Sequence, residues 1–200
     1  KPHTNHFPKP MLHVKGKPIL EHIILRAKNY GLSKFVISIY YLGHVIEEYF
    51  KDGKKFGVNI EYIKEESPLG TAGALNFLKK KNQKPFIVTN GDVLTSINYT
   101  NILEFHNKEL SIATMAVKMH EMSNPFGVVE IDGLNIIGFE EKPVNRLAIN
   151  AGVYVLNPEV LKYIKNNTNF DMPELFENLM LDKKSIKAYP IHEDWIDVGY

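Results

Sequence analysis

Apolar and polar residues alternate along this chain with two periods, one typical of helices and one typical of strands. The apolar positions within residues 19–27 recur at helical spacing, and Gly31 follows as a stop signal. The β-branched run at 35–39 predicts a strand, residues 45–50 predict a second helix, and residues 58–63 alternate like a second strand. This order predicts βαβ units.

The alternation of strands and helices continues along the chain and is interrupted once by paired strands. The further elements are predicted, in chain order, as a helix at 71–80, a strand at 86–88, a helix at 102–106, strands at 112–117, 127–131, 136–140 and 151–156, helices at 158–164 and 173–180, and a strand at 186–190. The Asp132-Gly133 pair between the strands at 127–131 and 136–140 predicts a β-hairpin.

Short connections between alternating strands and helices predict an α/β fold. We expect a Rossmann-like, mostly parallel, twisted sheet with helices on both faces and one small hairpin insertion. Sheets of this class bind ligands beyond the carboxyl ends of their strands. Polar residues follow the predicted strands at 90–92, at 140–143 and around Asp197, so these are the places where a binding site is expected.

Composition limits the class of protein and its partners. With 200 residues, of which 44% are hydrophobic, the chain suits one globular domain. Its 24 Lys and Arg residues nearly balance 23 Asp and Glu residues, so no global field attracts it to nucleic acid or to a membrane surface. No apolar run is long enough to span a membrane, and the absence of cysteine suits a reducing cytoplasm. We therefore expect a cytoplasmic protein that holds anionic ligands through local contacts.

Two aspartates lie in apolar surroundings in distant parts of the chain. Asp92 follows Asn90 and Gly91 after the apolar run at 86–89, and Asp197 lies between apolar residues near the end of the sequence. Mg2+ typically binds one or two carboxylates together with phosphate oxygens and water, so a converging pair of aspartates suits this cation. A plain turn explains either segment alone, because Asn, Gly and Asp are favoured in turns. A metal site therefore requires that the two segments meet in the fold.

Two lysines lie beside residues that would fix their position. Lys9 lies between Pro8 and Pro10, which restrict the backbone around it and make a stiff mount for a phosphate-binding ammonium group. Lys142 follows Glu141, so a group that donates to phosphate and a group that accepts from hydroxyls stand side by side, as binding of a sugar phosphate requires. Lysines in loops and charged runs are usually just solvated, and that interpretation stays open for both.

Small residues cluster at the start of the helix predicted at 71–80. Gly70, Thr71, Ala72 and Gly73 would let the backbone approach a flat ring, with free N–H groups facing an anion. Small residues equally serve the tight packing of a helix on a sheet, so both interpretations stay open. No His-x-x-x-His pair, Gly-x-Ser-x-Gly elbow or Gly-x-Gly-x-x-Gly fingerprint occurs, which argues against a zinc enzyme, a serine hydrolase and a dinucleotide-dependent dehydrogenase.

Taken together in this order, these segments resemble the sugar-1-phosphate nucleotidylyltransferases, also called nucleoside-diphosphate-sugar pyrophosphorylases, over almost the whole chain. The resemblance is greatest to the bacterial sugar-1-phosphate guanylyltransferases. It rests on the ordered set of motifs at residues 8–12, 16–20, 66–73, 90–92, 126–129, 141–143, 150–152 and 195–199. One such motif carries little weight, whereas the set in this order is specific.

The resemblance implies a glycosyltransferase-A-like fold and an enzyme that makes nucleotide sugars. Such an enzyme transfers a nucleoside monophosphate from a nucleoside triphosphate, here with GTP favoured, to a sugar 1-phosphate. The reaction depends on Mg2+ and releases pyrophosphate. The product would serve the synthesis of cell-surface polysaccharide.

Carried over position by position, the resemblance assigns roles to individual residues. The catalytic residues would be Lys9, Asp92, Lys142 and Asp197, with Asp92 and Asp197 as the Mg2+ ligands. The nucleotide would contact Lys9, Gly70, Thr71, Ala72, Gly73, Asn90 and Gly91, and the sugar 1-phosphate would contact Gly127, Glu141, Lys142 and Asn150. Lys9 would offset charge on the triphosphate, and Lys142 would bind the phosphate of the sugar.

One departure from the family pattern concerns the start of the sequence. Family members open with a strand and a glycine-rich Gly-Thr-Arg-Leu loop that have no counterpart here, and Lys1-Pro2-His3-Thr4 resembles the residues that follow that loop. We therefore expect residues 1–200 to form a nucleotidyltransferase domain that lacks its central first strand, in a natural chain that extends at both ends. A homo-oligomer and an upstream regulatory domain fit the same resemblance. The rival from another class is a catalytically inactive regulatory or nucleotide-sugar-binding subunit of the same fold.

Overall fold

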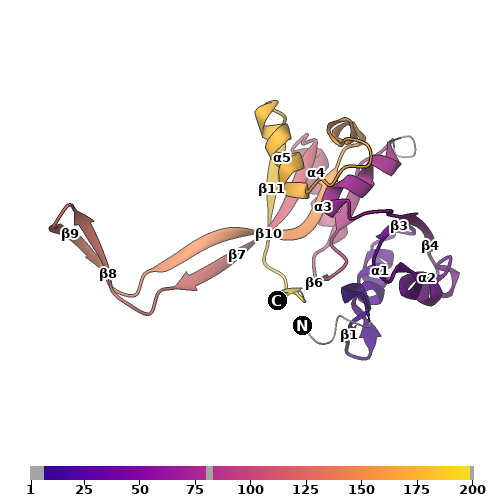
Figure 1. The fold of residues 1–200 in the computed structure, drawn as a ribbon, viewed down its shortest axis with the longest axis horizontal. Coiled ribbons are helices and arrows are strands. Elements are labelled where there is room, and N and C mark those ends of the chain that lie inside the picture. The colour runs from indigo at the N-terminus through magenta and orange to yellow at the C-terminus, as the bar shows by residue number, and fades with distance from the viewer. Residues whose placement is uncertain (1–6, 80–82, 199–200) are drawn as a thin grey trace.

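The computed structural model describes residues 7–79 and 83–198 of the chain. They form an α/β body from which a long two-stranded arm projects (Figure 1). The motif at residues 1–4 lies outside the described residues. Within the described part, no helix is both long enough and apolar enough to cross a bilayer.

The elements follow the alternation that the sequence predicts. The helices are α1 (Ile19–Asn29), α2 (Gly43–Phe50), α3 (Gly70–Gly73), α4 (Tyr99–Lys108) and α5 (Met172–Leu181), and the 3-10 helices are η2 (Lys9–Met11), η3 (Lys54–Phe56), η4 (Ala74–Leu78) and η5 (Pro158–Tyr163). The strands are β1 (His13–Val14), β2 (Lys17–Pro18), β3 (Lys34–Ile39), β4 (Asn59–Lys64), β5 (Phe86–Thr89), β6 (Val93–Thr95), β7 (Ala113–Ser123), β8 (Val128–Asp132), β9 (Asn135–Glu140), β10 (Val144–Leu156), β11 (Ile186–Ile191) and β12 (Trp195–Asp197).

The body is built on a four-stranded sheet in the order β11-β7-β10-β5. Strand β11 runs parallel to β7, whereas β10 runs antiparallel to both β7 and β5. Residues 151–156 of β10 are buried and alternate between the two faces. Val153 and Val155 pack with residues of α4 on one face, and Tyr154 and Leu156 pack with residues of α5 on the other. Helices thus cover both faces, and the predicted α/β class is confirmed, but this sheet is mixed rather than mostly parallel.

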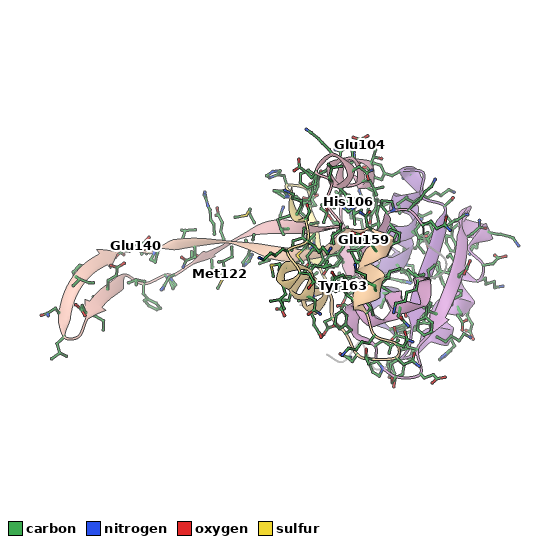
Figure 2. All side chains as sticks on the ribbon, turned by 90° about the horizontal axis from the view of Figure 1, so that it is seen from above. Glu104, His106, Met122, Glu140, Glu159 and Tyr163 are labelled. Carbon is green, nitrogen blue, oxygen red and sulfur yellow. The ribbon has the colours of Figure 1, made fainter. Side chains whose placement is uncertain are left out.

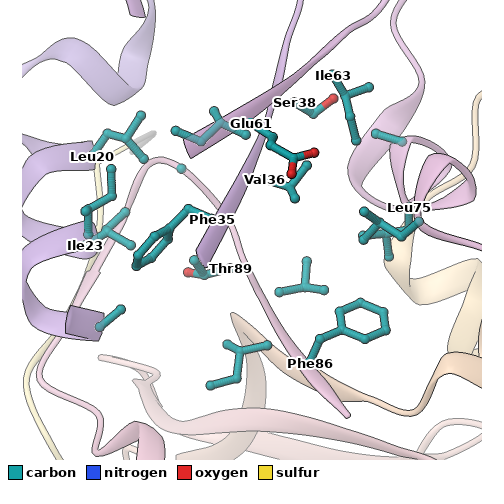
Figure 3. Close-up of a pocket in the computed structure, with 18 of the residues that line it drawn as sticks. Leu20, Ile23, Phe35, Val36, Ser38, Glu61, Ile63, Leu75, Phe86 and Thr89 are labelled. Carbon is teal, nitrogen blue, oxygen red and sulfur yellow. The ribbon is translucent and has the colours of Figure 1, made fainter. Parts of the chain in front are cut away.

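Strands β3 and β4 form a separate parallel pair that is not hydrogen-bonded to the four-stranded sheet. A cavity of about 1010 Å3 lies between β3 and β5. Its wall is mainly apolar and is formed by side chains of α1, β3, η4 and β5, among them Ile23, Phe35, Val36, Leu75 and Phe86 (Figure 3). Among the described residues, the facing edges of β3 and β5 pair with no further strand. The single sheet that the sequence predicts is therefore present as two parts.

The arm consists of the outer parts of β7 and β10, with the β8–β9 hairpin at its tip (Figure 1, Figure 2). The hairpin predicted around Asp132-Gly133 is confirmed. From the sequence, β7 and β10 are predicted to be shorter, at 112–117 and 151–156. The residues between these two ranges show no consistently apolar face. In the arm most side chains are exposed on both faces, so backbone pairing rather than burial defines these strands.

Some predicted elements differ from the structure in type. The helix predicted at 71–80 is a four-residue α-helical turn, α3, followed by the 3-10 helix η4, and the helix predicted at 158–164 is the 3-10 helix η5. Gly70 and Gly73 weaken a longer α-helix, and 3-10 geometry is common in short connectors. The strand pairs β1–β2 and β6–β12 are not predicted, because strands of two or three residues carry no period to detect.

A β-bulge interrupts β10 where the arm joins the body. The register of β10 against β7 shifts between Asn150 and Tyr154, and Gly152 adopts a left-handed backbone with a φ of +69°. A Cβ on Gly152 would lie 2.9 Å from Asn90 Nδ2 and 3.1 Å from Val93 Cγ2. The Gly152 carbonyl also accepts a hydrogen bond of 2.9 Å from the Asn90 N–H. Both the backbone conformation and the closeness of Asn90 therefore require glycine here.

A buried histidine joins α4 to the sheet. His106 is 1% exposed, its Nδ1 lies 2.8 Å from the Thr114 hydroxyl, and its Nε2 lies 3.2 Å from Asn157 Oδ1. The Ser111 hydroxyl lies 3.1 Å from the same Nδ1. Burial lowers the pKa of His106, and the hydrogen bond with Asn157 offsets part of that change. The ring is therefore neutral in the folded protein at neutral pH.

Replacing Gly152 by alanine is expected to destabilise the protein, because the new Cβ meets Asn90 and the backbone stays left-handed. The matched control is Gly133→Ala, since Gly133 is also left-handed, with a φ of +60°, but has no atom within 4 Å of its Cβ position. We expect the control to lower the free energy of unfolding by about 1 kcal/mol and Gly152→Ala by about 2 kcal/mol or more. Urea denaturation measures both, and equal losses would show that the contact with Asn90 costs nothing.

The protein is expected to lose stability through His106 as the pH falls. Because the pKa of His106 is lowered in the folded state, its stabilising contribution is complete above the pKa of an unfolded-chain histidine, about 6.5, and declines below that value. The free energy of unfolding, measured by urea denaturation across this range, should therefore fall less steeply in His106→Gln than in the wild type. His120→Gln, on the exposed arm, should leave the pH dependence in place. Identical declines in wild type and His106→Gln would contradict the prediction.

Candidate active site

The loop after β5 meets the N-terminal segment at the end of the sheet. The 3-10 helix η2 begins at Lys9, and Pro8 and Pro10 on either side restrict its backbone. Pro10 packs on Gly91, where a Cβ would lie 3.1 Å from Pro10 Cγ. Lys9 Nζ lies 3.8 Å from Asp92 Oδ2. The stiff segment around Lys9 therefore carries its ammonium group to the aspartate.

The ion pair between Lys9 and Asp92 is loose and open to solvent. The two side chains are 50% and 27% exposed, and an exposed pair of this kind contributes little to stability. Both groups stay within reach of a ligand. The ammonium group is able to bind a phosphate, and the carboxylate is able to bind a cation.

The second aspartate reaches the same place through the short strand pair β6–β12. Asp197 lies opposite Val93 in this pair, and the Val198 N–H donates a hydrogen bond of 3.1 Å to the Asp92 carbonyl. The segments that carry Asp92 and Asp197 are therefore neighbours in space, although they are far apart in the sequence. This is the convergence that a metal site requires.

The donors at this place fit a hard cation such as Mg2+. Mg2+ needs only one or two carboxylates, because phosphate oxygens and water complete its coordination. In the described ranges, no group of three or more His, Asp or Glu side chains gathers that would hold a metal on its own. A cation held by Asp92 and Asp197 would therefore need oxygen ligands from a bound phosphate.

Trp195 anchors β12 to the base of the arm, a role that the sequence does not reveal. Its Nε1–H donates a hydrogen bond of 2.8 Å to the Ala151 carbonyl, and Trp195 lies opposite Thr95 in the strand pair. The side chain thus ties the segment of Asp197 to the β10 bulge. The only signal in the sequence is that the single tryptophan of the chain lies two residues before Asp197.

Asn150 is fixed beside the bulge that touches Asn90. Its Nδ2 donates a hydrogen bond of 2.7 Å to the Tyr154 hydroxyl, and its Oδ1 accepts one of 2.9 Å from the Gly152 N–H. Burial raises the pKa of Tyr154, so this hydroxyl stays protonated at neutral pH. Of the predicted sugar-binding residues, Asn150 is thus the one that lies at the base of the arm.

Gly70 and Thr71 of α3 line the same cavity as the loop after β5. They line it together with Pro10, Thr89 and Gly91, and both are exposed. Predicted nucleotide-binding residues from two distant segments therefore face one space. From there the cavity continues between β3 and β5, where its lining is mainly apolar (Figure 3).

Three of the four N–H groups of the α3 turn are already hydrogen-bonded within the protein. The Thr71 N–H donates to Asp171 Oδ1 at 2.8 Å, and the Ala72 and Gly73 N–H groups donate to the Phe170 carbonyl at 2.9 and 3.0 Å. Ala72 and Gly73 are also buried. Of the two interpretations that the sequence leaves open, tight packing therefore holds for the second half of the turn, and only its first half faces the cavity.

The other predicted sugar-binding residues lie on the arm, away from Asp92. A Cβ on Gly127 would lie 2.9 Å from Glu141 Oε2, and Lys142 Nζ lies 3.9 Å from Glu141 Oε1. The Lys142 and Glu141 side chains are 68% and 78% exposed. Figure 2 shows the adjacent Glu140 far out along the arm. The structure thus brings these residues to one another but not to the aspartates.

Comparisons with known proteins show the family to which this chain belongs. The family described as Nucleotidyl transferase matches residues 1–200. The UTP–glucose-1-phosphate uridylyltransferase of Synechocystis sp. is 31% identical over 100% of this chain and 56% of that protein. The mannose-1-phosphate guanyltransferase of Saccharomyces cerevisiae is 32% identical over 100% of this chain and 57% of that protein.

Solved structures share the fold of this chain. HddC from Yersinia pseudotuberculosis, complexed with GMP-PN, has a TM-score of 0.72 at 25% identity and covers 97% of this chain and 85% of its own. The UDP-glucose pyrophosphorylase from Acinetobacter baumanii has a TM-score of 0.70 at 18% identity, over 98% of this chain and 85% of its own, which shows the fold alone.

The chain spans just over half of the length of the curated relatives, 56% and 57% for the two named. The family match, in contrast, covers residues 1–200. The resemblance to sugar-1-phosphate nucleotidylyltransferases expected from the ordered motifs is confirmed by these relatives and by the shared fold. This chain therefore belongs to the nucleotidyl transferase family.

Proposed function

We propose that this chain is the catalytic domain of a sugar-1-phosphate nucleotidylyltransferase. It transfers a nucleoside monophosphate from a nucleoside triphosphate to a sugar 1-phosphate and releases pyrophosphate, in the cytoplasm and in the supply of nucleotide sugars for cell-surface polysaccharide. The observation that carries the proposal is the gathering of Lys9, Asp92 and Asp197 beside the cavity that Gly70 and Thr71 line. GTP is the favoured donor because several relatives are named guanyltransferases and a similar structure is complexed with GMP-PN.

In this reaction the protein holds two anions in line and neutralises their charge. Lys9 offsets negative charge on the triphosphate, and Asp92 and Asp197 are the residues that would hold Mg2+. Bound Mg2+ supplies charge neutralisation and orientation of the phosphates. A phosphate oxygen of the sugar 1-phosphate forms a bond to the α-phosphorus while the bond from the α-phosphorus to the bridging oxygen breaks, and pyrophosphate leaves with that oxygen. No covalent enzyme intermediate forms, so the protein contributes position and charge.

In this reaction the sugar 1-phosphate contacts Gly127, Glu141, Lys142 and Asn150. Asn150 lies at the base of the arm, whereas the other three lie toward its tip. Binding of one sugar phosphate by all four therefore requires the arm to close toward the body. The bulge at Gly152 interrupts the strand ladder where the arm leaves the body, so it is the natural place for such a bend.

We also propose that the cavity between β3 and β5 accepts one further β-strand. Two of its sides are strand edges that pair with no other strand in the described part, and its lining is mainly apolar. Unpaired edges bind an extended backbone through main-chain hydrogen bonds. The occupant we propose is the first strand that the family resemblance places at the centre of the sheet. An apolar dye that binds residues 1–200 but not the natural chain would support this proposal, and equal binding to both would contradict it.

Pyrophosphate release by the natural chain is the direct test of the reaction. Each nucleoside triphosphate is paired with a panel of sugar 1-phosphates, with Mg2+ present or removed by a chelator. We expect release only when Mg2+ and both substrates are present, with GTP as the best donor. No release by a folded protein across the panel would favour the catalytically inactive, nucleotide-sugar-binding subunit instead.

Asp92→Asn and Asp197→Asn are each expected to lower kcat about a hundredfold or more, because each removes a charge that binds Mg2+. Circular dichroism and urea denaturation should show an intact fold, since asparagine has nearly the same shape. Asp52→Asn is the control, because Asp52 is 58% exposed and pairs with Lys54 outside the site, and it should keep wild-type turnover. An Asp92 or Asp197 variant with full turnover would remove that aspartate from the metal site.

A further inference from the structure

The α3 turn is held by a side chain that lies far away in the sequence. The Thr71 N–H and the Thr71 hydroxyl both donate to Asp171 Oδ1, at 2.8 and 3.1 Å, across 100 residues of chain. In return, the Thr71 hydroxyl accepts a hydrogen bond of 2.8 Å from the Met172 N–H. Thr71 therefore binds an N–H at the start of α5, and Asp171 binds an N–H at the start of α3. The two helix starts cap each other.

Neither helix has a side-chain cap of its own. Leu69 precedes α3 and Asp171 precedes α5, and neither makes a side-chain capping hydrogen bond to its own helix. An aspartate at the N-cap position normally accepts an N–H of the helix that follows it. Here the carboxylate turns to Thr71 instead. The aspartate therefore serves the shape of the α3 turn rather than the start of α5.

Gly70 makes room for this carboxylate. It has a left-handed backbone with a φ of +74°, and a Cβ on it would lie 2.7 Å from Asp171 Oδ1 and 2.7 Å from the Phe170 carbonyl oxygen. Any side chain at this position would push Asp171 away from Thr71. The glycine thus admits the group that holds Thr71, in addition to leaving the turn open to the cavity.

Backbone contacts extend the connection on the same side. The Phe170 N–H donates to the Leu69 carbonyl at 2.9 Å, and Asn169 Nδ2 donates to the Pro68 carbonyl at 3.1 Å. Among these contacts, only the one made by Asp171 involves a carboxylate, and hydrogen bonds to charged groups are the stronger kind. Asp171 is therefore the carboxylate that holds Thr71, whereas Glu65 accepts from the Leu69 N–H, at 2.9 Å, before the turn begins.

We propose that Asp171 is a positioning residue for the nucleotide, which it affects by fixing Gly70 and Thr71 in the arrangement that faces the cavity. The inference rests on the proposed function, in which these two residues contact the nucleotide. Asp171 itself does not line the cavity. Its influence on the nucleotide therefore passes through the turn.

The test is a set of steady-state kinetic measurements on variants of the natural chain. Asp171→Ala should raise the KM for the nucleoside triphosphate about tenfold, because the Thr71 N–H loses its charged partner. The kcat and the KM for the sugar 1-phosphate should change by less than about twofold. Asp171→Asn keeps an acceptor oxygen without the charge and should give an intermediate KM.

Asp182→Ala is the matched control, because Asp182 follows the other end of α5. Asp182 Oδ2 accepts a hydrogen bond of 2.6 Å from the Tyr163 hydroxyl. Its loss affects the same helix without touching the α3 turn, so the kinetic constants should stay at wild-type values. The inference fails if Asp171→Ala raises the KM of both substrates equally, or if Asp182→Ala raises the KM of the nucleoside triphosphate to the same extent.

Amide hydrogen exchange separates this inference from the proposed function. Without substrates, exchange at the Thr71 N–H should be about tenfold faster or more in Asp171→Ala and unchanged in Asp182→Ala. Unchanged exchange in Asp171→Ala overturns the inference, whatever the turnover. A wild-type chain that releases no pyrophosphate, with faster exchange in the variant, overturns the proposed function and confirms the contact between Asp171 and the turn.

Discussion

The burial of β10 on both faces is the constraint on which the rest of the structure depends. Its residues 151–156 pair with β5 and β7 and separate the core under α4 from the core under α5. Each large apolar side chain buried there contributes roughly 1.5–3 kcal/mol, and a shift of one residue would exchange the two faces. The fixed strand in turn positions the loop after β5 through Asn90 and the last strand through Trp195.

The elements that the sequence predicts best are those whose apolar residues recur regularly or form a continuous run. Helix α1 and strands β3, β4 and β5 begin and end within two residues of their predicted positions. The same reasoning places Asp92 directly after a strand, and the ordered motifs add Lys9 and Asp197. The structure brings these three segments together, because each lies at the end of an element that the core fixes.

The parts that the sequence does not predict lack a local pattern. The arm portions of β7 and β10 pair through their backbones with side chains exposed on both faces, so no apolar alternation marks them. The contact between Thr71 and Asp171 joins residues 100 positions apart, and an aspartate before a helix looks like the cap of that helix. The distance between the arm residues and the aspartates depends on how the arm leaves the body, which no motif encodes.

The exposed arm divides the molecule into parts that evolve under different constraints. In the body, most substitutions at buried positions cost folding free energy, and few of them persist. In the arm, even large side chains such as Phe126, Ile131 and Phe139 are 73%, 67% and 76% exposed, so their replacement costs the core nothing. Side chains of the arm can therefore be replaced at little cost in folding free energy, whereas replacements at buried positions of the body that carries the aspartates are costly.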